Sequence, residues 1–154
     1  MNSGFRQIWI IYGALTMGQI ILALVVVYWL TSGGATDASE MPSLDYIVPL
    51  SLVGAVFSAY TLNRVLAGKA SQQKGLSAKL DHYQNRVIIR SALIEGANLL
   101  VLISAMLTGK MSFLLFFLAG FGMFILFYPR MSVFSSEYAL TTDELMALNP
   151  KGLH

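Results

Sequence analysis

Four long runs of apolar residues constrain the fold of this chain more than any other feature of its sequence. They cover residues 8–30, 46–67, 87–108 and 111–128. Each run has roughly the 17 to 25 residues that a helix needs to cross about 30 Å of hydrocarbon. Hydrocarbon offers no partner to backbone amides, so each run is expected to be helical. The sequence therefore predicts an all-α fold, a bundle of four transmembrane helices.

The composition agrees with a membrane protein and excludes several kinds of site. Charged residues make up 12% of the 154 residues, whereas about 25% is usual in a soluble domain. The chain has no cysteine, which excludes disulfides, zinc–thiolate sites and iron–sulfur clusters. Neither histidine lies in an apolar run. We therefore expect no metal and no cofactor. The net charge of +2, without a basic stripe, predicts no nucleic-acid partner.

The basic residues set the expected orientation. The second connection is rich in Lys and Arg, whereas the first, residues 31–45, has three carboxylates and no basic residue. Arg6 and Arg130 flank the outermost runs. Positively charged segments stay in the cytoplasm. Both termini are therefore expected on the cytoplasmic side of a bacterial inner membrane.

The chain divides into two parts. Residues 1–130 form the predicted membrane domain, and residues 131–154 form a cytoplasmic tail. In the tail, Thr141 and Glu144 have the spacing of a capping box, in which the two side chains bond each other's backbone amides. The sequence predicts a short cytoplasmic C-terminal helix after Thr141.

Small residues predict where the helices pack, because close approach stabilises helix pairs in lipid. Ser51, Ala55 and Ala59 recur at every fourth residue of the second run, as do Ala92 and Gly96 in the third. We expect these two faces to meet. In the fourth run, phenylalanines surround Gly120, which predicts a wide lipid face with one point of close approach.

Polar residues form stripes on two of the predicted helices. Thr16 and Gln19 share one face of the first, and Ser91, Glu95 and Asn98 share one face of the third. Gln19 and Asn98 both fall about 16 Å from the cytoplasmic ends at 1.5 Å per residue. They are expected to hydrogen-bond if these helices are neighbours. The stripes are either interhelical contacts or a polar pathway through the bundle.

Glu95 is the one acidic residue well inside a run, about 12 Å from its cytoplasmic end. A charge at such depth costs at least about 2.5 kcal/mol and marks a functional hypothesis. It is tolerated if the carboxyl is protonated or paired. Arg64 is the expected partner. Arg90 is a further candidate for interhelical contact, although it and Arg86 are also expected to extend toward the headgroups.

A short segment resembles a known family. Residues 88–97, with the Ala92-Leu93-Ile94-Glu95 sequence, continue into the apolar residues 100–103. This segment resembles the second helix of the rotor-ring proteolipid, subunit c, of rotary ATP synthases. The resemblance implies that Glu95 carries a proton or a sodium ion and that Ser91 or Asn98 helps to coordinate it. The whole chain also looks like one of the small four-helix membrane proteins of bacteria.

The residues predict a non-enzymatic protein. The sequence has no Gly-x-Ser-x-Gly elbow, phosphate-binding glycine loop or metal motif. We expect a structural or accessory component of a membrane assembly, in contact with membrane lipid and with protein partners or further copies of itself. The alternative is a proton- or sodium-handling unit that uses Glu95. A lipid-modifying enzyme is a third hypothesis, for which the sequence offers no catalytic group.

Overall fold

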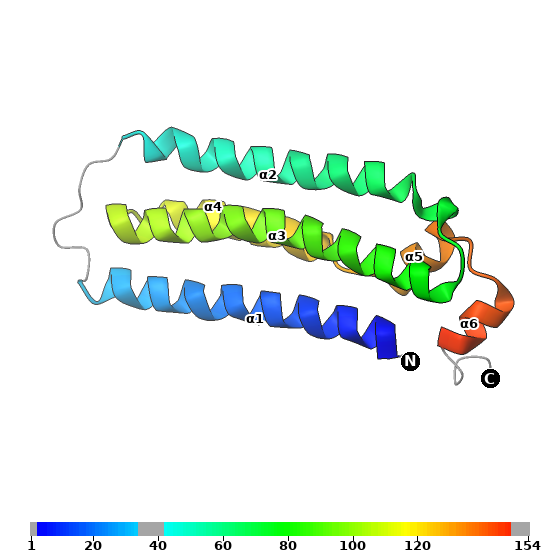
Figure 1. The fold of residues 1–154 in the computed structure, drawn as a ribbon. Helices are drawn as coiled ribbons and strands as arrows, with labels where there is room; N and C mark the ends of the chain where they lie inside the picture. Colours follow the sequence, from blue (N-terminus) through cyan, green and yellow to red (C-terminus); the bar gives the residue numbers. More distant parts are fainter. Residues whose placement is uncertain (1–2, 34–41, 149–154) are drawn as a thin grey trace.

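The computed structural model describes residues 3–33 and 42–148, and within these ranges the chain is all-α. Figure 1 shows α1 to α4 lying nearly side by side, with the shorter helices at one end. They are α1 (Ser3–Thr31), α2 (Leu44–Ala67), the 3₁₀ helix η1 (Ala70–Gln72), α3 (Leu76–Thr108), α4 (Phe113–Leu126), α5 (Met131–Glu137) and α6 (Thr142–Leu148). The predicted all-α class is confirmed for the described residues. Residues 34–41 of the first connection and 149–154 of the predicted tail lie outside the described ranges.

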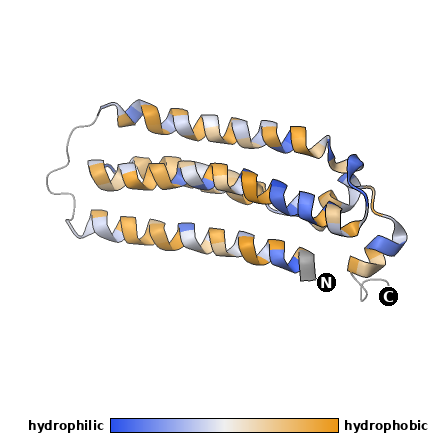
Figure 2. Cartoon of the chain, viewed as in Figure 1, coloured by the Kyte–Doolittle hydropathy of each residue, from blue (hydrophilic) through white to orange (hydrophobic). Residues whose placement is uncertain are grey.

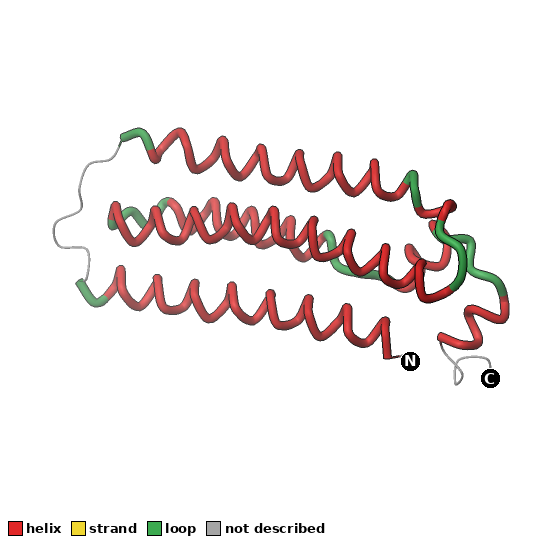
Figure 3. Tube along the Cα trace, in the orientation of Figure 1, coloured by secondary structure: helices red, strands yellow, loops and turns green. Residues whose placement is uncertain are grey.

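Three helices, α1, α2 and α3, are long and apolar enough to cross a membrane. The fourth predicted run forms a shorter helix than expected. α4 has 14 residues, about 21 Å at 1.5 Å per residue, and it reaches the length of a span only together with α5, from which it is bent by 56°. The helix ends before Pro129, because proline disfavours a helical conformation in the residue that precedes it. Figure 3 shows the turn between the two helices.

α3 is the central helix of the bundle. It packs against α1, α2 and α4, and Figure 1 shows α4 behind it, with α1 and α2 on either side. Its 33 residues extend about 50 Å. The helix begins at Leu76, well before the apolar run that starts at residue 87. It ends at Gly109, whose φ of +66° is the left-handed conformation that closes many helices. The short turn that follows makes α3 and α4 antiparallel.

The two ends of the bundle differ in polarity. We call the end that holds the beginning of α1, the beginning of α3, η1 and α6 the polar end, and the opposite end the far end. Figure 2 shows hydrophilic residues concentrated at the polar end and apolar residues along the helices. The described parts of both termini lie at this end.

The interior has two apolar clusters with polar residues between them. The cluster at the polar end contains several aromatic residues, among them Phe5, Tyr83, Phe134 and Tyr138. The cluster at the far end is built from the residues Val26, Val48, Val101, Leu102, Ala105, Phe113 and Phe117. The buried pair Gln19 and Asn98 lies between the two clusters along α1 and α3.

Gly120 is the point of closest approach that the sequence predicted for the fourth helix. It is buried, and a Cβ atom on it would lie 2.8 Å from Cδ1 of Leu52 and would overlap the side-chain amide of Asn98. The absence of a side chain therefore lets α4 approach α2 and α3 together.

Gly120→Ala should destabilise the protein by about 2 kcal/mol, because overpacking of a filled site has a cost of this order. The matched control is Gly122→Ala on the same helix, since no atom lies within 4 Å of a Cβ there. Thermal unfolding of both variants in detergent measures the difference. Equal melting temperatures for the two variants would contradict the close packing at Gly120.

Candidate functional site

Gln19 and Asn98 join α1 to α3 in the middle of the bundle. The Asn98 Nδ2 group donates to Oε1 of Gln19 at 2.7 Å, and both side chains are buried. The hydrogen bond predicted from their matching depth is present. The Asn98 Oδ1 atom has no hydrogen-bond partner in the described part of the chain and lies against Gly120. The pair therefore joins α1 to α3 at the level where α4 approaches closely through Gly120.

Thr16 makes no interhelical contact of this kind. Its hydroxyl donates to the Tyr12 carbonyl of the same helix at 2.8 Å. A threonine in a helix commonly bonds the carbonyl four residues earlier. The prediction that Thr16 joins two helices is therefore wrong.

The three candidate ion ligands of α3 make no hydrogen bond to one another. Glu95 is partly buried and makes no hydrogen bond or ion pair with any residue that the structure describes. Ser91 is buried and its hydroxyl is likewise unpartnered in the described ranges, whereas Asn98 is bonded to Gln19. Arg64 is exposed near the end of α2, and the expected Arg64–Glu95 ion pair is not formed.

One side of α3 is not covered by the other described helices. We call it the open face, and its exposed residues recur at helical spacing. They are Ile89, Ala92, Gly96, Ile103 and Leu107, with Glu95 at the edge. The expectation that Ala92 and Gly96 pack on α2 is therefore wrong, although Ala59 of α2 is buried as expected. The bundle instead buries the polar side of α3, because its polar groups require partners inside the protein.

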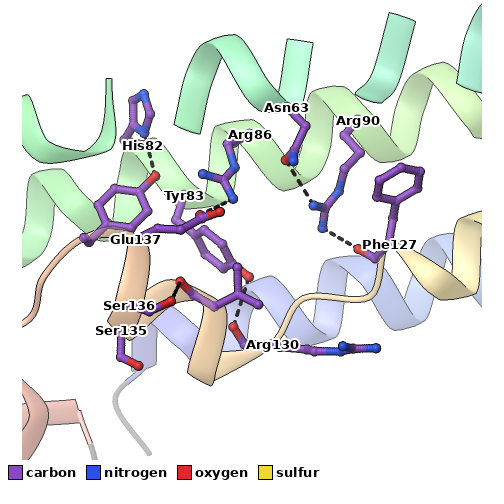
Figure 4. Close-up of polar contacts among 12 residues, drawn as sticks. Asn63, His82, Tyr83, Arg86, Arg90, Phe127, Arg130, Ser135, Ser136 and Glu137 are labelled. Atoms are coloured by element: carbon purple, nitrogen blue, oxygen red, sulfur yellow. Dashed lines mark hydrogen bonds and ion pairs between the residues drawn. The ribbon is translucent and has the colours of Figure 1, made fainter. Parts of the chain in front are cut away.

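Two arginines of α3 are buried at the polar end. In Figure 4, Arg86 points toward Glu137 of the C-terminal segment (α5 and α6), whereas Arg90 points toward Asn63 and Phe127. Arg86 donates to the Glu137 carboxylate of α5. Arg90 donates to Oδ1 of Asn63 on α2 at 3.2 Å and to the Phe127 carbonyl at the end of α4. Arg90 therefore makes the interhelical contact that was expected. The expectation that both arginines extend to the headgroups is wrong.

The charges of this cluster are not balanced. Glu137 is the only carboxylate that forms an ion pair with either arginine among the described residues. The Arg90 guanidinium has only neutral acceptors, and it lies 5.3 Å from the centre of the Phe127 ring, a cation–π distance. Glu137 therefore pairs with Arg86 alone, and the charge of Arg90 has no counter-charge bonded to it among the described residues.

Polar side chains of the C-terminal segment contact the first turns of α3. Lys79 forms an ion pair with Glu144 at 2.8 Å, and His82 Nδ1 lies 2.6 Å from the Tyr138 hydroxyl. The hydrogen bond from Lys79 lowers the pKa of Glu144, and burial raises the pKa of Tyr138 to about 12. Both bonds of the predicted capping box between Thr141 and Glu144 are present.

Sequence reasoning missed most of this cluster. Glu137 lies 51 residues from Arg86, and Tyr138 lies 56 residues from His82. No local spacing relates such residues. Two signals were available: Arg86 and Arg90 lie one turn apart on α3, and Glu137 and Glu144 are acidic residues in a tail facing a basic connection.

Glu137→Gln should destabilise the protein by about 3 kcal/mol, because it leaves the buried Arg86 without its counter-charge. The matched control is Asp143→Asn, which removes an exposed carboxylate of α6 and should cost less than about 1 kcal/mol. Chemical unfolding in detergent gives both values. A Glu137 variant as stable as the Asp143 variant would refute the importance of this ion pair.

The contact between α6 and α3 should weaken in acid. The folded state lowers the pKa of Glu144 from 4.5, so the contact is fully stabilising above pH 4.5 and is lost as the pH falls through the lower folded value. Hydrogen exchange of residues 142–148, corrected for the intrinsic rate, should rise in this acidic range. In Glu144→Gln the protection should be low throughout. A pH profile identical in the two proteins would refute the role of Glu144.

The structure thus offers two features for functional interpretation, an uncovered helix face with a carboxyl at its edge and a buried cluster with excess positive charge. No known protein family, curated protein or solved structure matches this chain.

Proposed function

We propose that this chain is a non-catalytic protein of the bacterial inner membrane and serves as a structural or accessory component of a membrane assembly. The observation that carries the proposal is the open face of α3, where Ala92 and Gly96 lie beside Glu95. A helix of a partner protein, or of a second copy, packs on this face. The carboxyl then receives a hydrogen bond that the described part of the chain does not provide.

The apolar surface supports a membrane location. Large apolar side chains are exposed on all the long helices, among them Leu24 (64% exposed), Leu50 (72%) and Leu118 (62%). A soluble monomer rarely exposes extended apolar patches, whereas lipid chains solvate them. Four spans follow if the bilayer thins locally around the short α4.

The distribution of charge supports an orientation with both termini in the cytoplasm. Arg6, Arg64 and Lys69 are exposed at the polar end. At the far end, Lys110 is paired with Asp45 at 2.6 Å. The excess of basic residues at the polar end is typical of the cytoplasmic side.

The chemistry of the open face favours a helix as its partner. Ala92 and Gly96 are four residues apart, and such small residues let two helices approach closely in lipid. A Cβ on Gly96 would meet no atom within 4 Å, so the glycine is not explained by packing within the described bundle. An unpaired charge in hydrocarbon costs at least about 2.5 kcal/mol. A donor on the partner helix would remove much of this cost.

The interior polar groups make contacts between elements of the structure, and this supports a non-catalytic role. Gln19, Asn98, Arg86 and Arg90 are engaged with other helices or with the C-terminal segment. These contacts hold elements together, whereas Glu95 makes none of them and lies at the edge of the open face, where a partner can reach it.

A second candidate function is the handling of protons or sodium ions by Glu95. One observation favours it: the buried Ser91 hydroxyl, which has no partner in the described ranges, lies one helical turn before Glu95. Residues at this spacing share a helix face. An ion at Glu95 would then find a second oxygen nearby.

Gly96→Leu should disrupt the assembly, because it blocks close approach on the open face. The matched control is Gly54→Leu on α2, which is also exposed with no atom within 4 Å of its Cβ. The size of the tagged complex in mildly solubilised membranes, measured by native electrophoresis, should fall for the first variant only. A complex of unchanged size in both variants would refute the proposal.

Glu95 variants separate the two functions. Glu95→Leu should weaken association about fivefold, since an interhelical hydrogen bond in lipid is worth about 1 kcal/mol, and Glu95→Gln should retain most of it. Purified protein in vesicles should show no proton or sodium flux. Flux in the parent protein that disappears in Glu95→Gln, with the complex intact, would instead establish ion handling.

A further inference from the structure

A second surface feature lies away from the open face. An apolar groove runs between α2 and α4, from Leu52 to Tyr60 on one wall and from Ala119 to Phe127 on the other. Its volume is about 460 Å³. Each wall covers eight residue steps, which is about 12 Å along the helices. The groove is therefore long, narrow and parallel to the spans.

The groove is bounded differently at its two ends. Toward the far end, Gly120 and Leu52 bring the two walls close together. Toward the polar end, the Arg90 side chain reaches from α3 to both sides, to Asn63 of α2 and to the Phe127 carbonyl, as Figure 4 shows. Arg90 also faces the Phe127 ring, which lines the groove. An occupant thus has apolar walls along its length, and the buried charge of Arg90 lies behind the Phe127 wall at the polar end.

The positive charge at the polar end of the groove favours an anionic ligand. The Arg90 guanidinium is buried, its Nε atom has no partner, and it forms no ion pair among the described residues. Arg64 is exposed one helical turn beyond Tyr60, on the same face of α2. Arginine binds phosphate through two parallel hydrogen bonds. A phosphate at the mouth of the groove would satisfy Arg64 and offset the charge of Arg90.

We propose that this groove binds one molecule of an anionic phospholipid. An acyl chain lies between α2 and α4, and the phosphate headgroup binds Arg64 near the buried charge of Arg90. The apolar walls exclude a polar occupant, and the cations at one end select an anionic headgroup over a zwitterionic one. A free phosphate ion would not fill the apolar part.

Native mass spectrometry of the intact protein tests the proposal. The protein is purified with equal amounts of phosphatidylglycerol and phosphatidylcholine that carry the same acyl chains. The parent protein should retain one phosphatidylglycerol molecule in preference to phosphatidylcholine. Arg64→Gln should reduce this preference about fivefold, which corresponds to about 1 kcal/mol for one basic residue near a membrane surface. The matched control is Arg6→Gln, an exposed arginine at the same end.

A second pair of variants tests the groove itself. Ala119→Phe fills it and should abolish retention of the bound lipid, whereas Ala14→Phe alters an exposed alanine of α1 and should not. Melting temperatures establish that all variants are folded.

Three outcomes would overturn the proposal. The first is equal retention of the two lipids by the parent protein. The second is an Arg64→Gln variant with the same preference as Arg6→Gln, which would mean that the groove takes acyl chains without regard to headgroup. The third is undiminished retention by a folded Ala119→Phe variant.

Discussion

The need of buried polar groups for partners is the constraint on which the rest of this structure depends. α3 carries Arg86, Arg90 and Asn98 on its buried side, and each finds its partner on a different element. Arg86 requires α5, Arg90 requires both α2 and the end of α4, and Asn98 requires α1. Because unpaired polar groups are costly away from water, these contacts hold the neighbouring elements around α3. Some atoms of the same side chains, such as Arg86 Nη1 and Asn98 Oδ1, have no partner among the described residues.

The contacts of α3 differ in strength from one level of the bundle to another. At the middle level, the Gln19–Asn98 hydrogen bond is a neutral contact, worth about 0.6 to 1.7 kcal/mol in lipid. At the polar end, charged groups and stacked aromatic rings act together: Phe5 stacks on Tyr83, with ring centres 6.1 Å apart, and Phe134 packs beside both. The polar end is therefore the more strongly held part, and it is where the C-terminal segment docks.

The same arrangement separates the interior from the surfaces available to other molecules. Once the polar side of α3 is buried, its opposite side is left open, with Glu95 at the edge. The Arg90 side chain extends between α2 and the end of α4. The groove between these two helices has apolar walls, and its polar end lies near this positive charge. We propose that the first surface receives a helix and the second a lipid, and the groups that would bind them, Glu95 and Arg64, are not buried.

The sequence by itself determined the helices and those contacts that depend on periodicity. Apolar run length predicted the three long helices, equal depth predicted the Gln19–Asn98 bond, and local spacing predicted the capping box at Thr141. Gly120 was recognised as a point of close approach because small residues have this role wherever helices pack. Only the tertiary structure decided which side of α3 is covered and where Arg86 and Arg90 point. Their partners lie between 27 and 51 residues away in the chain, and no helical period relates such positions. Ala92 and Gly96 form a surface on which a helix could pack. The charged and amide groups on the other side of α3 have the stronger need for partners inside the bundle, so the side with Ala92 and Gly96 is left exposed.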